Sequence, residues 1–411
     1  MGISERIDRV LDDLVKSGAA PGVAAIVVND KGPLYQGAAG TKGVGRSEPM
    51  TLDTMFWYAS MTKALVAAGA MQLIERGRLK LDEPASLILP ELSSVQVLDG
   101  FEADGAPKLR PAKRPITPRQ LLTHTAGYGY NWANGVILRY LEKNDLPDLI
   151  HCKRRSLDQP LLADPGDRWE YGISIDWIGQ LIEAVSGQSL RDYLRKNLFD
   201  PLGMDHTDFI QTAEQKARRA TVHQKHADGT IVPIPDHEVA QDPEFFMGGG
   251  GLCGLPDDYA GFIQMMLAGG KSKSGEAVLK PETVALMGEN HIAPLEAGVI
   301  KIAMPNLSHD VDFFPGQRQG WGLSFLINLE RSPEGRSPGS LSWGGLANTY
   351  FWIDPTAKIG GLIMTQVIPF ADPTILKAYR AFERTVYEEL AGRGRLSQAK
   401  DGSSRSAMSL F

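Results

Sequence analysis

Residues 60–76, which read SMTKALVAAGAMQLIER, set a serine and a lysine three positions apart at the start of a stretch that is apolar on almost every face. This pattern predicts a helix over 63–76 that stops at Gly77, and a helix without a polar face normally runs through the middle of a protein. The stretch is much too short to cross a bilayer. The sequence therefore predicts a central buried helix with Ser60 and Lys63 at its N-terminal end.

Ser60 and Lys63 together have the chemistry of an activated nucleophile. A serine hydroxyl attacks poorly until a base removes its proton. Residues three apart share one helix face, so the lysine amine can reach the hydroxyl, and apolar surroundings favour the neutral amine that a base requires. The helix N-terminus adds free N–H groups and positive potential. Because a Ser-x-x-Lys spacing is common by chance, its significance depends on other motifs.

Three motifs farther along the chain accompany this pair. LLTHTAG at 121–127 closes a segment whose start at Thr117 has the pattern of a capped helix. PGDRWEYG at 165–172 contains Tyr171, and SWGG at 342–345 is rich in small residues that let a substrate lie against the backbone. Each motif alone indicates only a packed aromatic residue or a turn.

In this order and spacing, with GGGGL at 248–252 and LGM at 202–204, the motifs resemble those of the serine β-lactamase and penicillin-recognising superfamily. The chain is similar in particular to family VIII carboxylesterases, which have a class C β-lactamase fold, and also to fungal statin side-chain acyltransferases. The resemblance spans roughly 5–392. It implies an α+β, β-lactamase-like fold and a serine hydrolase, for which we expect no cofactor and no metal.

The resemblance also implies catalytic roles. Ser60 matches the nucleophile, Lys63 the helix lysine, and Tyr171 the tyrosine that shares the proton with that lysine. The backbone N–H groups of Ser60 and of Leu346, which follows the third motif, would form the oxyanion hole, where donors stabilise the developing negative charge.

The expected substrate-binding residues depart from the β-lactamase pattern. Trp343, Gly344 and Gly345 stand where β-lactamases have Lys-Thr-Gly, and Ile173 stands where their Tyr-x-Asn motif has asparagine. A β-lactam therefore loses the two polar contacts that suit its amide and its carboxylate, so we expect poor β-lactam turnover. Tyr130 matches an aromatic residue that lines the acyl pocket of the esterases.

Strand and helix patterns occur at both ends of the chain, with a mainly helical region between them. Helices are expected over 4–17 and 373–391, and strands over 23–28, 34–39, 322–329, 349–353 and 360–365. The simplest packing is one antiparallel sheet flanked by helices, with a helical domain inserted. We expect an α/β domain of residues 1–95 plus 300–392, an inserted domain of 96–299, and a disordered tail of 393–411.

The composition excludes several classes of partner. The net charge of −6 and the absence of a long basic run argue against nucleic-acid binding. No apolar stretch has the length of a membrane span, and the N-terminus has no signal-peptide core, so we expect no membrane association. Cys152 and Cys253 are the only cysteines in 411 residues, which fits a reducing cytoplasm. The expected partner is a small-molecule ester; the oligomeric state cannot be read from the sequence.

The function that this pattern favours is hydrolysis of short-chain carboxylic esters through an acyl-Ser60 intermediate, with Lys63 and Tyr171 as the base. An acyltransferase that moves the acyl group to an alcohol is the alternative, since both reactions form the same acyl-enzyme. A β-lactamase, a D-amino-acid peptidase and a non-catalytic ligand sensor are weaker alternatives.

Other catalytic patterns are poorly represented. No G-x-S-x-G is present, so the α/β-hydrolase nucleophile turn is missing. His223 and His226 are close in sequence, but without H-E-x-x-H they indicate two surface histidines in a polar segment. His124 is expected to hold a loop near the site. The KSG triplet at 273–275 precedes a capped segment, and we interpret it as a loop that only imitates the third motif.

Overall fold

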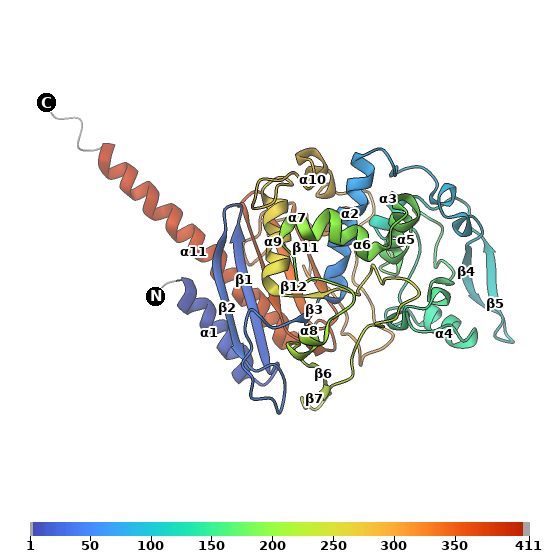
Figure 1. The fold of residues 1–411 in the computed structure, drawn as a ribbon, viewed down its shortest axis with the longest axis horizontal. Coiled ribbons are helices and arrows are strands. Elements are labelled where there is room, and N and C mark those ends of the chain that lie inside the picture. Colours follow the sequence, from blue (N-terminus) through green and yellow to red (C-terminus); the bar gives the residue numbers. More distant parts are fainter. Residues whose placement is uncertain (1–2, 406–411) are drawn as a thin grey trace.

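A seven-stranded antiparallel sheet is the centre of the computed structural model, which describes residues 3–405 (Figure 1). The strand next to the N-terminus, β1, pairs with β13, so that Ala24 lies opposite Met364. This confirms the expected β-lactamase-like fold, in which both chain ends build one sheet. In order across the sheet, the strands are β2 (Pro33–Gly40), β1 (Gly22–Asn29), β13 (Ile359–Met364), β12 (Thr349–Asp354), β11 (Ser340–Gly345), β10 (Leu326–Asn328) and β9 (Gln319–Trp321).

Two terminal helices, α1 (Ile3–Lys16) and α11 (Pro373–Arg405), pack together on one side of this sheet (Figure 1). The periodic residues Ile7, Leu11 and Leu14 of α1 are buried, as expected for one apolar helix face. On the other side, α9 (Pro256–Leu267) packs against β1 and β13.

The central helix is α2 (Thr62–Glu75), which is preceded by the 3₁₀ turn η1 (Ala59–Met61). Its residues from Thr62 to Leu73 are all buried, which confirms the expectation from its apolar sequence. It packs against α5 (Ser174–Ser186) of the mainly helical middle region.

The other described helices and turns lie between η1 and β9. They are η2 (Ala85–Leu87), η3 (Pro90–Ser93), α3 (Pro118–Leu122), α4 (Gly135–Lys143), η4 (Leu149–His151), η5 (Arg154–Leu157), α6 (Leu190–Leu194), η6 (Arg195–Phe199), α7 (Asp200–Leu202), α8 (Ala213–Ala217) and α10 (Pro281–Met287). The short strands outside the main sheet are β3 (Phe56–Trp57), β4 (Gln96–Phe101), β5 (Pro107–Pro111), β6 (Val222–Lys225), β7 (Ile231–Ile234), β8 (Cys253–Gly254) and β14 (Val367–Ile368). The boundaries at 95/96 and 299/300 between the two domains stay a prediction.

Three expectations from the sequence were wrong. The strand expected over 322–329 is instead a hairpin of β9 and β10, because the chain turns between Trp321 and Leu326, where Ser324 has a φ of 77°. The helix expected to end at 391 continues to Arg405, so residues 393–405 of the expected disordered tail are helical. An existing helix lengthens one residue at a time, and Gln, Lys and Arg are good helix formers. Residues 406–411 of that tail lie outside the described residues.

The third wrong expectation concerns His223, which was expected at the surface and is fully buried. Its Nε2 accepts the Val44 N–H at 3.0 Å, and its Nδ1 lies 3.3 Å from the Gln366 carbonyl. His223 therefore ties β6 to two distant segments.

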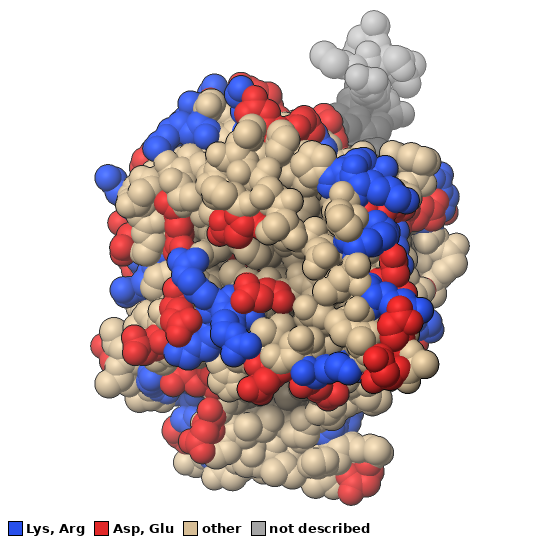
Figure 2. All heavy atoms as spheres, turned by 90° about the vertical axis from the view of Figure 1, so that its right-hand side faces the viewer, with Lys and Arg blue, Asp and Glu red and all other residues tan. Residues whose placement is uncertain are grey.

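Within residues 3–405, no helix combines the length and the apolar character needed to cross a membrane. On the face drawn in Figure 2, acidic and basic side chains are interspersed, which agrees with the modest net charge of −6.

Candidate active site

Ser60 lies in a strained turn between β3 and α2. The residue before it, Ala59, has a φ of 47°, in the left-handed region that non-glycine residues avoid. Such strain persists only where the surrounding structure holds it, and it clusters at functional sites. Ser60 itself is partly exposed, whereas its neighbours Ala59 and Met61 are buried.

Lys63 is fully buried one turn after Ser60. Its Nζ donates to Ser60 Oγ at 3.0 Å, to Tyr130 Oη at 3.0 Å and to the Gly249 carbonyl at 2.6 Å. Burial lowers the pKa of Lys63, and the negative charge of Asp176 opposes that shift. An amine with a lowered pKa beside a serine hydroxyl can take up the serine proton.

Tyr171 lies beside Lys63, whose Nζ is 4.9 Å from the centre of the tyrosine ring. The Tyr171 hydroxyl accepts the indole N–H of Trp343 at 3.0 Å. Burial raises the pKa of Tyr171, while hydrogen bonds with Ser60 and Trp343 lower it in part. His124 packs against the same ring with 4.8 Å between centroids, and its Nδ1 accepts the Gly172 N–H, so it holds the loop that carries Tyr171.

Strand β11 runs directly past the nucleophile turn. A side chain on Gly345 would collide with the Tyr58 carbonyl, and only glycine allows this approach. A Cβ on Gly344 would lie 2.8 Å from the Tyr350 ring, so this position is also crowded. Leu346, the next residue, lines the same cavity as Ser60. The two expected oxyanion donors thus belong to segments in contact with each other.

The cavity at Ser60 has a volume of about 350 Å³ and a mostly apolar lining. Its aromatic and aliphatic side chains include Trp57, Trp132, Ile150, Met247, Leu307 and Ile368. Asp148 also lines it, but its carboxylate already accepts the Ile150 N–H and an Asn131 amide N–H. Among the described residues, no lysine or arginine lines this cavity.

Tyr130, expected only by resemblance, also belongs to this cluster. Besides its contact with Lys63, its ring lies 5.3 Å from that of Tyr171 and stacks on Trp132 at 5.4 Å between centroids. The structure therefore brings all eight expected site residues into one region.

Two residues at the site were missed by sequence reasoning. Gly249 supplies the carbonyl that binds Lys63, and Asp176 accepts the Gly249 N–H at 2.8 Å. The glycine run at 248–251 and a single acidic residue inside the apolar stretch 173–178 were the available signals.

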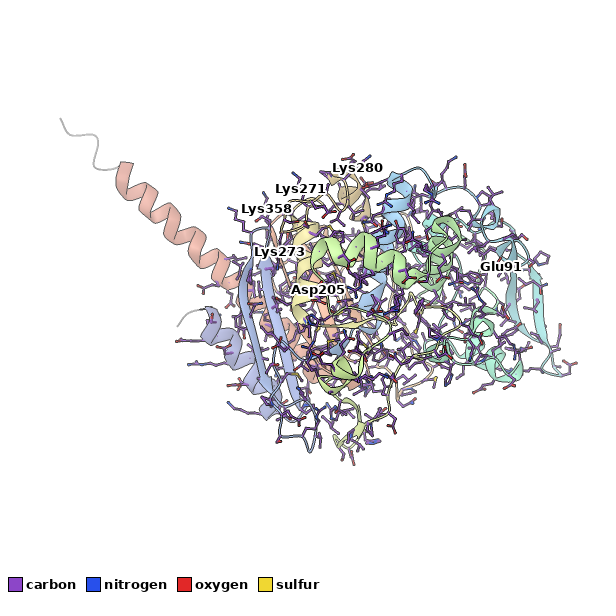
Figure 3. All side chains as sticks on the ribbon, viewed as in Figure 1. Glu91, Asp205, Lys271, Lys273, Lys280 and Lys358 are labelled. Carbon is purple, nitrogen blue, oxygen red and sulfur yellow. The ribbon has the colours of Figure 1, made fainter. Side chains whose placement is uncertain are left out.

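The KSG triplet is remote from this cluster. Lys273 is exposed in the turn between α9 and α10, together with Lys271, and both are labelled in Figure 3. Ser274 of the triplet is bonded locally to Ser272 at 2.8 Å between the two Oγ atoms. This agrees with the interpretation of the triplet as a loop.

Comparisons with known proteins agree with the fold. A model of the family described as Beta-lactamase matches residues 7–384. Monacolin J acid methylbutanoyltransferase of Aspergillus terreus is 33% identical over 390 residues, which cover 91% of this chain and 93% of that protein. Lovastatin esterase of Penicillium rubens is 28% identical over 401 residues, 93% of this chain and 98% of the esterase.

The solved structure of unliganded simvastatin synthase from Aspergillus terreus superposes with a TM-score of 0.81 at 31% identity. The superposition covers 93% of this chain and 97% of the synthase. The relatives thus include both acyltransferases and an esterase.

Proposed function

This chain is an enzyme of the β-lactamase family, and we propose that it is a serine carboxylesterase that cleaves short-chain esters through an acyl-Ser60 intermediate. The observation that carries the proposal is the hydrogen bond of 3.0 Å between Lys63 Nζ and Ser60 Oγ, at the wall of an apolar cavity. Tyr171, which is bonded to Trp343, completes the base.

In the proposed reaction, Ser60 Oγ attacks the ester carbonyl while its proton passes to the Lys63–Tyr171 pair. The N–H groups of Ser60 and Leu346 stabilise the negative charge on the carbonyl oxygen. When the tetrahedral intermediate collapses, the bond to the alcohol oxygen breaks and Tyr171 returns the proton to that oxygen. Water then attacks the acyl-enzyme by the same proton path in reverse.

The cavity supports esters with an uncharged, apolar acyl group as the substrate class. Its apolar walls favour burial of such a group. No lysine or arginine lines it among the described residues, and the nearby Lys63 is already bonded to Ser60, Tyr130 and Gly249, so a substrate carboxylate there has no free cationic partner. Trp343 and Ile173 also offer neither a cation nor an amide to the carboxylate and the amide of a β-lactam.

Acyl transfer to an alcohol is the second candidate function. The 33% identity to a methylbutanoyltransferase favours it, and so does a separate cavity of about 420 Å³ that borders Tyr171 and could hold an alcohol. Turnover of p-nitrophenyl esters with and without added alcohols distinguishes the two reactions. Transfer predicts an acylated alcohol as product, and hydrolysis predicts only the free acid.

The test of the proposed function is Ser60→Ala with p-nitrophenyl butyrate. We expect kcat to fall on the order of 10³-fold or more, as in other serine hydrolases without their nucleophile. Ser324→Ala is the matched control, because it removes a buried hydroxyl that has no hydrogen-bond partner among the described residues and does not line the cavity, so it should leave kcat unchanged. Labelling by a fluorophosphonate, mapped to Ser60, gives a readout that does not depend on the substrate. A folded Ser60→Ala enzyme with retained turnover would refute the proposal.

We also infer that the enzyme works in a reducing cytoplasm. Its two cysteines, Cys152 and Cys253, are both free and buried, which suits such a compartment.

A further inference from the structure

Asp176 is a buried carboxylate that the reaction described above does not use. It lies in the first turn of α5 and has no exposed surface. Its Oδ1 accepts the Gly249 N–H at 2.8 Å, and its Oδ2 has no hydrogen-bond partner among residues 3–405. Burying a carboxylate is costly unless a partner compensates for the lost water, so its position requires an explanation.

Gly249 connects this carboxylate to Lys63. The N–H of Gly249 is bound by Asp176, and its carbonyl accepts from Lys63 Nζ at 2.6 Å. A Cβ on Gly249 would lie 2.6 Å from Asp176 Oδ2 and 2.9 Å from Tyr130 Oη. Glycine therefore leaves no side chain between the carboxylate and the groups around Lys63.

Lys63 is the basic group that interacts electrostatically with Asp176, and Gly249 is hydrogen-bonded to both. Burial raises the pKa of Asp176 and lowers the pKa of Lys63, and the attraction between the two charges opposes both shifts. The other titratable groups that respond to the charge of Asp176 or Lys63 are uncharged in their ordinary forms: Tyr130, Tyr171, Cys152 and His124.

We propose that Asp176 is a positioning residue of the active site, which fixes Gly249 as the acceptor for Lys63 and balances the lysine charge after proton transfer. The proposal rests on the proposed function of Ser60. When Ser60 Oγ forms its bond to the acyl carbon, the lone pair of Lys63 Nζ takes the proton. Asp176 itself neither gains nor loses a proton, and its charge stabilises the ammonium that forms.

Two substitutions of Asp176 separate the effect of its negative charge from the effect of its hydrogen bond with the Gly249 N–H. Asp176→Asn keeps an oxygen that can accept the Gly249 N–H but removes the charge. Without that charge the pKa of Lys63 falls, so the rising limb of kcat/KM against pH should move about 1–2 units toward acid. The plateau should fall several-fold, because a weaker base assists Ser60 less. Asp176→Ala removes the anchor as well and should reduce the plateau at least about 10-fold further, as expected when a catalytic group loses its positioning.

Asp258→Asn is the matched control. Asp258 is a similarly buried carboxylate with a raised pKa, but it is bonded to Thr207 and His206, away from Lys63. Asp258→Asn should change the melting temperature without changing the pH at which kcat/KM rises. A purely structural role for Asp176 predicts the same result for both Asn variants, and that outcome would overturn the proposal.

The rate of Ser60 labelling by a fluorophosphonate, measured against pH, keeps this proposal separate from the proposed function. If Ser60 of the wild-type enzyme is labelled but the enzyme does not cleave esters, the proposed function fails. The role of Asp176 is still decided by whether the rise of the labelling rate with pH is shifted in Asp176→Asn. If that variant does not fold, Gly249→Ala tests the same link, because its methyl group would displace the carboxylate. The proposal would be refuted if Ser60 of Gly249→Ala is labelled at the wild-type rate and this rate rises at the same pH as in the wild type.

Discussion

The indole N–H of Trp343 provides the most direct test of how Tyr171 works. This N–H donates to the Tyr171 oxygen at 3.0 Å, and both side chains are almost fully buried. A donor at this position stabilises the phenolate more than the phenol, so it lowers the pKa of Tyr171 against the effect of burial. Trp343→Phe keeps an aromatic ring and removes only this donor and part of the ring volume.

The expected loss follows from the charge on the acceptor. A hydrogen bond to a charged group is worth about 1.5–3 kcal/mol, against about 0.5–1.5 kcal/mol for a neutral pair. If Tyr171 gains negative charge when Ser60 reacts, the loss is the difference of about 1–1.5 kcal/mol between the charged and the neutral bond, so kcat/KM should fall about 5- to 12-fold, at about 1.4 kcal/mol per factor of ten. Because Lys63 and Tyr171 act as one coupled base, the higher pKa of Tyr171 without the donor should move the limb on which kcat/KM rises with pH about 1 unit toward alkali.

Both quantities can be measured with p-nitrophenyl butyrate over pH 6–10, after subtraction of spontaneous hydrolysis. Trp352→Phe is the control for lost volume. Trp352 is fully buried in β12, and its indole N–H has no acceptor among the described residues. The Trp352→Phe variant should be less stable, with a lower melting temperature, but its kcat/KM should be unchanged. An unshifted limb in Trp343→Phe, or an equal loss of kcat/KM in both variants, would show that the hydrogen bond to Tyr171 does not assist the reaction.

Three further predictions concern the base and the substrate. Lys63→Ala and Tyr171→Phe should each cause a severe loss of kcat/KM. The double variant should lose little more than the worse single variant, because the two residues move one proton as a unit. Losses of kcat/KM that multiply independently would exclude a shared base. Lys63→Arg should also fail, since a guanidinium keeps its proton in this pH range. The kcat/KM for p-nitrophenyl butyrate should greatly exceed that for nitrocefin, because Ile173 and Trp343 replace the amide and the cation that a β-lactam needs; comparable values would contradict this.

Local sequence patterns predicted the parts of the fold that depend on neighbouring residues. The periodicity of α1 and the apolar character of α2 gave helices within one residue of their observed ends. The capping box at Thr117 is present, with its side chain bound to the Gln120 N–H. The β9–β10 hairpin was missed because its strands have only three residues each, too few for a period of two to be recognised.

The site was predictable only in part, because its contacts join segments far apart in the chain. Ser60 and Lys63 are one helix turn apart, so their contact follows from local geometry. Lys63 is bonded to Tyr130, 67 positions away, and to Gly249, 186 positions away. No periodicity encodes such distances, and Tyr130 was expected only from resemblance to known esterases.

The sequence nevertheless contains a signal of the interaction between Asp176 and Lys63. Lys63 is the only charged residue between 60 and 74, and Asp176 is the only one between 173 and 182. A charge inside an apolar helix must find a compensating partner when that helix is buried. Because α2 and α5 pack against each other, the two single charges of opposite sign on these helices lie close enough to shift each other's pKa, and Gly249 is hydrogen-bonded to both side chains. Single opposite charges in two apolar helices therefore predict a buried pair, and a buried lysine three positions after a serine makes that pair part of the candidate active site.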